Sequence, residues 1–207
     1  MKDIKNILFD LGGVLYHINY NLTKVAFEKL GVNDFNTHYS QQQQNKLFDN
    51  LEIGKISSKE FISKMLEIIP HSKQEDIVDA WNALLLGFTK ENLKLLECLS
   101  GKYKLYLLSN TNAIHIEKIN SELQGLFGYT SLDEFFEKTY LSHEIGRRKP
   151  DIETFEWLLK DAGIKAEETL FIEDSIQHVE SADKVGIKTV LWGSNKPITA
   201  FFLDKAQ

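Results

Sequence analysis

Four short apolar runs, each ending at polar side chains or at glycine, constrain the fold of this chain more than any other feature. They cover residues 6–10, 103–108, 169–172 and 188–192, and a weaker fifth candidate covers residues 138–141. Near-continuous apolar runs of this length are typical of parallel strands buried on both faces. Patterns with helical spacing lie between them, over residues 91–99, 111–123, 151–162 and 175–185. The alternation predicts βαβ units and an α/β fold with a mostly parallel sheet.

One long segment, residues 21–86, interrupts this alternation and contains only helical patterns. Ser57 and Glu60 have the spacing of a capping box ahead of an amphipathic stretch. We expect a small helical cap, residues 16–87, inserted after the first strand of a core formed by residues 1–15 and 88–207. The run Gln41–Gln44 in this segment is expected on a solvated helix face.

Composition excludes several classes of protein. Hydrophobic residues make up 43% of the 207 residues, which is enough for a sizeable core. The net charge of −6 and the single short basic run at 147–149 argue against nucleic-acid binding. A signal peptide and a run of ~18 apolar residues are both missing, so no membrane partner is expected. We expect a cytoplasmic monomer or homodimer.

The single cysteine, Cys98, excludes an intramolecular disulfide framework. It lies in a leucine-rich helical pattern, which favours a buried structural thiol over a reactive one. A reducing compartment is consistent with this composition.

Polar side chains follow three of the predicted strands, at the edge where open α/β sheets bind ligands. Asp10 ends the first strand and precedes Gly12 and Gly13, which allow the backbone to turn sharply and approach a ligand. A carboxylate in this position can act as a nucleophile towards phosphorus. A structural role, with Asp10 capping a turn, is equally compatible with this residue alone.

A hydroxyl and an ammonium group come from two further segments. Ser109 and Asn110 follow the second strand and open a helix, where a phosphate can bind, although such residues also act as helix N-caps. Lys149 precedes Pro150 at the start of another helix, so its backbone is held extended. It is a candidate for neutralising Asp10 and a phosphoryl oxygen, although most lysines are simply solvated.

Glu173 and Asp174 end an otherwise apolar strand. Two adjacent acids in such a place are costly unless they are paired or bind a metal. Because Asp10 supplies another hard oxygen ligand, we favour a Mg²⁺ site over the alternative, in which one acid caps a helix and the other is exposed.

Four ordered motifs resemble those of the haloacid dehalogenase-like superfamily, with a type 1 cap. They are Asp10-Leu11-Gly12-Gly13, Leu108-Ser109-Asn110, Arg148-Lys149-Pro150 and Ile172-Glu173-Asp174. Within this superfamily, the motifs are similar to those of a bacterial subgroup that includes an α-D-glucose-1-phosphate phosphatase. The resemblance implies a Rossmann-like open parallel sheet with helices on both faces, and a Mg²⁺-dependent phosphatase that forms an aspartyl-phosphate.

The resemblance also implies a role for each site residue. Asp10 would be the nucleophile, and Ser109 and Lys149 would bind the phosphoryl group, with Asn110 beside them. Mg²⁺ would be held by Asp10, the carbonyl of Gly12, and Asp174, with Glu173 joining directly or through water.

One position departs from the family pattern. Most phosphatases of the family have a second aspartate two residues after the nucleophile, acting as general acid and base, where this chain has Gly12. Loss of a general acid typically costs 10²–10⁴-fold in rate, so a substrate with a good leaving group, such as a sugar 1-phosphate, would suffer least. His17 is our candidate for a substitute and for substrate binding, although a packing role is at least as compatible with the sequence.

The cap is expected to choose the substrate, a small phosphorylated metabolite. Tyr16, Tyr20, Phe48 and Trp81 are candidates for lining the site, and packing between cap helices is the alternative for each of them. Two other functions stay open: a metal-independent 2-haloacid dehalogenase, which the acids 173–174 disfavour, and a non-catalytic protein that binds a phosphorylated metabolite.

Overall fold

A five-stranded parallel sheet forms the centre of the molecule. The computed structural model describes residues 3–32, 46–193 and 196–204. The sheet has the order β5-β4-β1-β6-β7, and every neighbouring pair is parallel. Its strands are β1 (Asn6–Phe9), β4 (Lys104–Ser109), β5 (Lys138–Leu141), β6 (Thr169–Glu173) and β7 (Lys188–Leu191). All five predicted strands are confirmed, and the predicted α/β class with them.

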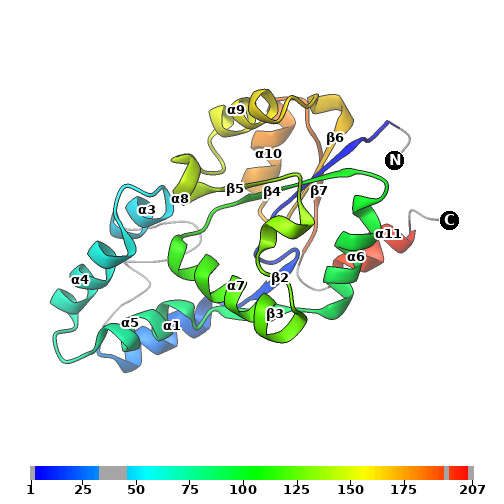
Figure 1. Ribbon diagram of the computed structural model, residues 1–207. Helices are drawn as coiled ribbons and strands as arrows, with labels where there is room; N and C mark the ends of the chain where they lie inside the picture. The colour runs from blue at the N-terminus through cyan, green and yellow to red at the C-terminus, as the bar shows by residue number, and fades with distance from the viewer. Residues whose placement is uncertain (1–2, 33–45, 194–195, 205–207) are drawn as a thin grey trace.

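Helices cover both faces of this sheet (Figure 1). Leu8 and Phe171 point to the face covered by α9 (Ile152–Ala162) and α10 (Ile176–Lys184). Ile7 and Phe9 point to the other face, which packs against α6 (Lys90–Ser100), α7 (Ala113–Phe127) and α11 (Ile198–Asp204). Successive strand residues therefore serve two separate cores, and this explains why the strands are apolar along their whole length.

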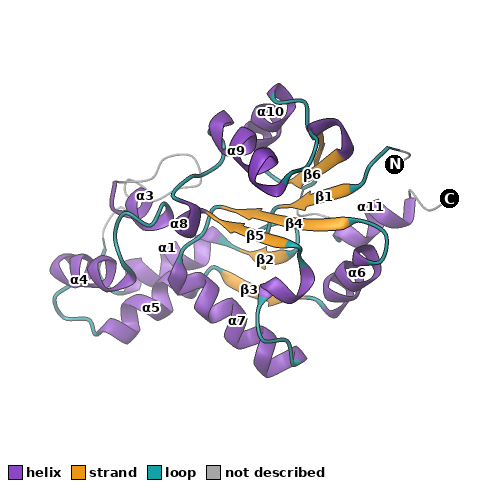
Figure 2. Cartoon of the chain, turned by 45° about the horizontal axis from the view of Figure 1, so that its top comes forward, coloured by secondary structure: helices purple, strands orange, loops and turns teal. Residues whose placement is uncertain are grey.

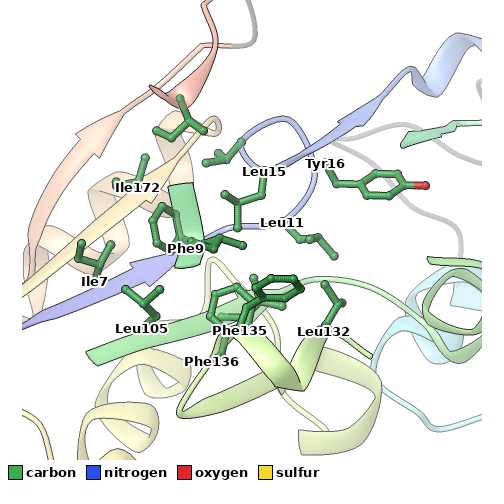
Figure 3. Close-up of a cluster of buried hydrophobic side chains, with 14 of the residues drawn as sticks. Ile7, Phe9, Leu11, Leu15, Tyr16, Leu105, Leu132, Phe135, Phe136 and Ile172 are labelled. Carbon is green, nitrogen blue, oxygen red and sulfur yellow. The ribbon is translucent and has the colours of Figure 1, made fainter. Parts of the chain in front are cut away.

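The larger core extends beyond the carboxyl end of β1. Figure 3 shows Leu11 and Leu15 beside Phe9, Tyr16 further along the chain, and Leu132, Phe135 and Phe136 on the opposite side of Phe9 and Leu11. Leu132 and Phe135 belong to a 3₁₀ turn, η1 (Leu132–Phe135). The loop that follows β1 is thus held by buried side chains on both sides of the residues that the sequence singles out.

Four helices form a separate layer beside the sheet edge, with an apolar cluster of their own (Figures 1 and 2). They are α1 (Tyr20–Lys29), α3 (Lys46–Glu52), α4 (Ser58–Ile68) and α5 (Gln74–Asn82). The predicted capping box is confirmed at α4, where Ser57 Oγ accepts from the Glu60 N–H at 3.2 Å and Glu60 Oε2 accepts from the Ser57 N–H at 2.8 Å. Gln41–Gln44 lie outside the described residues.

A two-stranded antiparallel ribbon connects these helices to the sheet. It consists of β2 (Tyr16–Ile18) and β3 (Leu85–Phe88). The expectation of helix alone up to residue 86 is therefore wrong at its end. β3 is short and partly exposed, with Leu86 on its outer side, so its composition carries no alternating pattern. The sequence patterns also do not predict η1, α8 (Ser142–Ile145), η2 (Ala166–Glu168) or α11.

Cys98 corrects another expectation, because its side chain is exposed. Leu93, Leu96 and Leu99 occupy the inward positions of α6, and Cys98 falls between them on the outer side. None of the described helices combines the length and apolarity that crossing a bilayer requires.

Candidate active site

The three central strands deliver the predicted site residues to one edge of the sheet. Asp10 directly follows β1, Ser109 is the last residue of β4, and Glu173 is the last residue of β6. Because β1 lies between β4 and β6, the carboxyl ends of these strands are neighbours. The structure therefore brings together residues that are far apart in the sequence.

Lys149 lies between two buried carboxylates. Its Nζ is 2.5 Å from Asp10 Oδ1 and 2.7 Å from Glu173 Oε2, and its side chain is 1% exposed. Burial alone would lower the pKa of Lys149, but the charges of Asp10 and Glu173 raise it. The lysine is thus a fixed cation whose charge is shared with the carboxylates on either side of it.

The amide of Asn110 holds the backbone of Lys149. Asn110 Nδ2 donates to the Lys149 carbonyl at 2.8 Å, and the Lys149 N–H donates to Asn110 Oδ1 at 2.9 Å. Both polar groups of the Asn110 side chain are engaged in this way. In this structure the side chain positions Lys149, while the neighbouring Ser109 lines the pocket described below. Asn112, further along the chain, is the N-cap of α7.

Glu173 is held at both of its oxygens. Oε1 accepts from the N–H groups of Asp174 at 2.9 Å and Ser175 at 3.0 Å. Oε2 contacts Lys149 and lies 3.0 Å from His178 Nδ1. Burial would raise the pKa of Glu173, but Lys149 and His178 outweigh it and keep the pKa below its ordinary value. Glu173 is therefore an ionised anchor for the lysine and for the loop that follows β6.

Among the residues that the structure describes, one cluster of three side chains could ligate a metal: Asp10, Glu173 and Asp174. One oxygen from each lies within 4.8 Å of the others. Burial, followed by the charge of Glu173, raises the pKa of Asp10 to about 7. Burial, followed by the charge of Asp10, raises the pKa of Asp174 to about 8. The single positive charge of Lys149 does not balance the three carboxylates when all are ionised. Carboxylate oxygens are hard ligands, the kind that Mg²⁺ prefers.

Gly13 allows the loop after β1 to lie against Asp174. Its φ is +82°, and a Cβ at this position would be 2.0 Å from Asp174 Oδ2. A side chain here would have to displace the carboxylate, so the glycine is required for this arrangement.

Two adjoining cavities open at this edge of the sheet. A pocket of about 270 Å³ is lined by the charged residues Asp10, Arg148, Lys149, Glu173 and Asp174, together with Ser109 and His178. A smaller cavity of about 60 Å³ extends from it towards the cap, and Gly12, Tyr20, Glu52, Ser109 and Asn110 line both. Residues of the cap and the core thus meet where the two cavities join.

The family model for haloacid dehalogenase-like hydrolases matches residues 7–192. The chain belongs to the haloacid dehalogenase-like family. It is 34% identical over 191 residues to a D-ribitol-5-phosphate phosphatase from Bacteroides thetaiotaomicron, an alignment that covers 90% of each chain.

Solved structures of other family members agree with this assignment. An aspartate-to-alanine variant of a haloacid dehalogenase family enzyme from Bacteroides thetaiotaomicron, in complex with magnesium and inorganic phosphate, has a TM-score of 0.90 and 34% identity, covering 96% of this chain and 98% of that one. A predicted haloacid dehalogenase-like hydrolase from Porphyromonas gingivalis has a TM-score of 0.89 and 31% identity, covering 99% and 98%.

Two features distinguish this family member at the place where an acid is expected. A Cβ on Gly12 would be 2.9 Å from Ile18 Cδ1, so the end of the Ile18 side chain would have to shift to admit a side chain here. His17, the predicted substitute, is exposed on β2 and lines neither cavity. The structure does not bring it to the site.

Of the aromatic residues considered for the cap, Tyr16 and Tyr20 line the smaller cavity, while Phe48 and Trp81 lie in the apolar cluster of the cap helices. Sequence reasoning missed Glu52, His115 and His178, which line the cavities. His178 could have been found, because it follows Asp174 by one helical turn at the start of α10. Glu52 and His115 offered no such signal, since acids and histidines on amphipathic helices are mostly solvated.

Proposed function

We propose that this chain is a Mg²⁺-dependent phosphatase that cleaves small phosphoric monoesters, with Asp10 as its nucleophile. The observation that carries the proposal is the cluster of Asp10, Lys149 and Asp174 at the edge of the sheet, in a pocket large enough for a phosphoryl group. Magnesium and phosphate bound to a similar family member support the choice of ligand.

In this mechanism the chain itself supplies the nucleophile and the positive charge. A carboxylate oxygen of Asp10 forms a bond to phosphorus while the ester P–O bond breaks, and the departing alkoxide takes up a proton from water. Lys149 neutralises charge on the phosphoryl oxygens, and the Ser109 hydroxyl donates to one of them. Water then hydrolyses the aspartyl-phosphate, which regenerates Asp10 and releases inorganic phosphate.

Asp10, Asp174 and the Gly12 carbonyl are the groups proposed to hold the metal. Glu173 takes part through water, because both of its oxygens already have partners. Bound Mg²⁺ would supply further neutralisation of the phosphoryl charge. The raised pKa values of Asp10 and Asp174 favour this assignment, because a cation would offset both the burial and the repulsion that raise them.

We propose a phosphorylated sugar or sugar alcohol as substrate, with residues 16–87 acting as the cap that encloses it. The D-ribitol-5-phosphate phosphatase supports a polyol phosphate. A sugar 1-phosphate stays within this proposal, because Gly12 supplies no acid and such an ester has a good leaving group.

A panel of phosphoesters, assayed with Mg²⁺ and with EDTA, tests the proposal. We expect phosphate release that requires Mg²⁺ and that Asp10→Asn abolishes. Asp79→Asn, at an exposed position on α5, is the matched control and retains activity. Release that persists in Asp10→Asn would overturn the mechanism. Activity in EDTA would favour a metal-independent reaction. A beryllofluoride adduct without turnover would favour a binding protein.

A further inference from the structure

The smaller cavity lies where the leaving group of a phosphoester would extend. It shares Tyr20, Glu52 and Ser109 with the larger pocket proposed to bind the phosphoryl group, so a leaving group that extends from that pocket into this cavity would pass these residues. Beyond them, the cavity continues past His115 and Ile119 of α7 and Leu84 beside the cap ribbon. Its lining therefore contacts the part of the substrate that differs from one phosphoester to another.

Glu52 brings a carboxylate into this cavity from the end of α3. It is 6% exposed, and its Oε2 lies 3.3 Å from Arg148 Nη2. The same guanidinium contacts Asp49 Oδ1 at 2.5 Å, so one core arginine contacts two cap acids. An ionised carboxylate only accepts hydrogen bonds. Glu52 thus favours hydroxyl donors and repels a second anionic group.

His115 brings a second acceptor from α7. Its Nδ1 lies 2.9 Å from Asn82 Oδ1, and its ring stacks on Trp81 at 4.9 Å and 18°. Because the amide oxygen can only accept, Nδ1 carries the proton and Nε2 is left as an acceptor. Burial lowers the pKa of His115 to about 3, so the ring is neutral at physiological pH.

We propose that this cavity binds an uncharged, polyhydroxylated leaving group, and that Glu52 and His115 determine specificity by accepting hydrogen bonds from its hydroxyl groups. The inference rests on the proposed phosphatase function and assigns recognition of the leaving group to two residues. Two acceptors on different elements match a chain of neighbouring hydroxyls. An anionic leaving group would be disfavoured by the negative charge of Glu52. An apolar alcohol would displace water from the cavity and offer Glu52 no hydroxyl donor in its place.

The test compares Glu52→Gln with Asp49→Asn, which removes the other acid that contacts Arg148 but lines neither cavity. The substrates are ribitol 5-phosphate, acetyl phosphate, which has no hydroxyl groups, and 3-phosphoglycerate, which is anionic. The measured quantity is the ratio of kcat/KM between substrates, and this ratio cancels general losses of activity.

For Glu52→Gln we expect the ratio of ribitol 5-phosphate to acetyl phosphate to fall about tenfold or more, mainly through KM, because a hydrogen bond to a charged acceptor is weakened. We expect the ratio of 3-phosphoglycerate to ribitol 5-phosphate to rise. Asp49→Asn leaves both ratios unchanged. His115→Phe keeps a ring against Trp81, and we expect it to lower the first ratio as well.

Several results would overturn the inference. Unchanged ratios in Glu52→Gln and His115→Phe would show that neither residue contacts the leaving group. Equal changes in Asp49→Asn would show that the Arg148 contacts alone are responsible. Wild-type protein that cleaves acetyl phosphate but no polyol phosphate would overturn the inference and leave the phosphatase function intact. Failure to cleave any phosphoester would overturn both.

Discussion

At the scale of single residues, Gly12 and Ile18 define how this site differs from a family member with an acid two positions after the nucleophile. The Cβ that a side chain would add at Gly12 meets the Cδ1 atom of Ile18 at 2.9 Å, whereas the other near Ile18 atoms are 3.7 and 3.8 Å away. Gly12 is not among the glycines with positive φ, so its backbone conformation admits other residues. One terminal methyl group is therefore the main obstacle to an acid here.

We expect Gly12→Asp alone to lower the free energy of unfolding by about 1 kcal/mol, at the low end of the cost of overpacking, because only the end of the Ile18 side chain must shift. Ile18→Val removes the obstructing atom, so the double variant should recover most of that loss. It should also cleave esters with poor leaving groups about 10²-fold faster than wild type, because a general acid is restored. Urea unfolding of all four proteins and kcat on an alkyl phosphate check both points. If the change in unfolding free energy of the double variant equalled the sum of the two single changes, the contact between residue 12 and Ile18 would be contradicted.

The residues of the phosphate pocket were predictable for a simple reason. Asp10, Ser109 and Glu173 follow strands whose apolar composition is visible in the sequence, and parallel strands bring their carboxyl ends together. Glu52 reaches the site only because the cap helices pack in a particular way. No local pattern distinguishes its carboxylate from the solvated acids of other helices.

At the scale of elements, the start of α7 connects the core to the cap. Asn112 Oδ1 accepts from the His115 N–H at 3.1 Å and from Trp81 Nε1 at 3.3 Å. One side-chain oxygen therefore caps a core helix and contacts a cap helix at the same time. His115 completes the junction through its stacking on Trp81.

His115 should make stability depend on pH. Its pKa of about 3 in the folded protein lies below the ordinary 6.5, so the unfolded chain binds a proton that the folded protein excludes. The resulting stability is complete above pH 6.5 and is lost as the pH falls towards 3. The difference in unfolding free energy between wild type and His115→Phe should change by about 2 kcal/mol from pH 6.5 to 5. Parallel pH curves for the two proteins would contradict this.

Element lengths explain which parts of the fold were predictable. The sheet strands are buried on both faces, and the longer helices have clear amphipathic patterns, so both were found. β2 and α8 have three and four residues, too few for a period to be recognised. The turn around Gly54 is likewise not predictable from the local sequence. Its Cβ would be 2.1 Å from the His143 carbonyl oxygen, a contact made only when the cap meets α8.

At the scale of the whole molecule, the carboxylate cluster couples metal binding to stability. The pKa values of Asp10 and Asp174, about 7 and 8, lie above the ordinary 3.8. The folded, metal-free protein retains protons that the unfolded chain has released. Its stability should therefore be highest near pH 4 with respect to these groups and should fall as the pH rises towards 8.

We expect Mg²⁺ to raise the melting temperature more at pH 8 than at pH 5.5, because the metal binds deprotonated carboxylates and compensates their repulsion. Thermal unfolding in EDTA and in MgCl₂ at both pH values measures this. Asp174→Asn is the matched control and should lose most of the Mg²⁺ effect. An equal shift at both pH values would show that the metal does not bind these groups.

The position of β1 in the sheet determines when the sheet and the site can be completed during synthesis of the chain. Asn6 pairs with Lys104 on one side and with Thr169 on the other, so β1 has both neighbours only after the chain has been synthesised as far as β6. The cap helices that follow β1 can associate with one another in the meantime. Asp10 is therefore synthesised before Lys149 and Asp174, and a growing chain that has not reached them carries the nucleophile without the groups proposed to activate it.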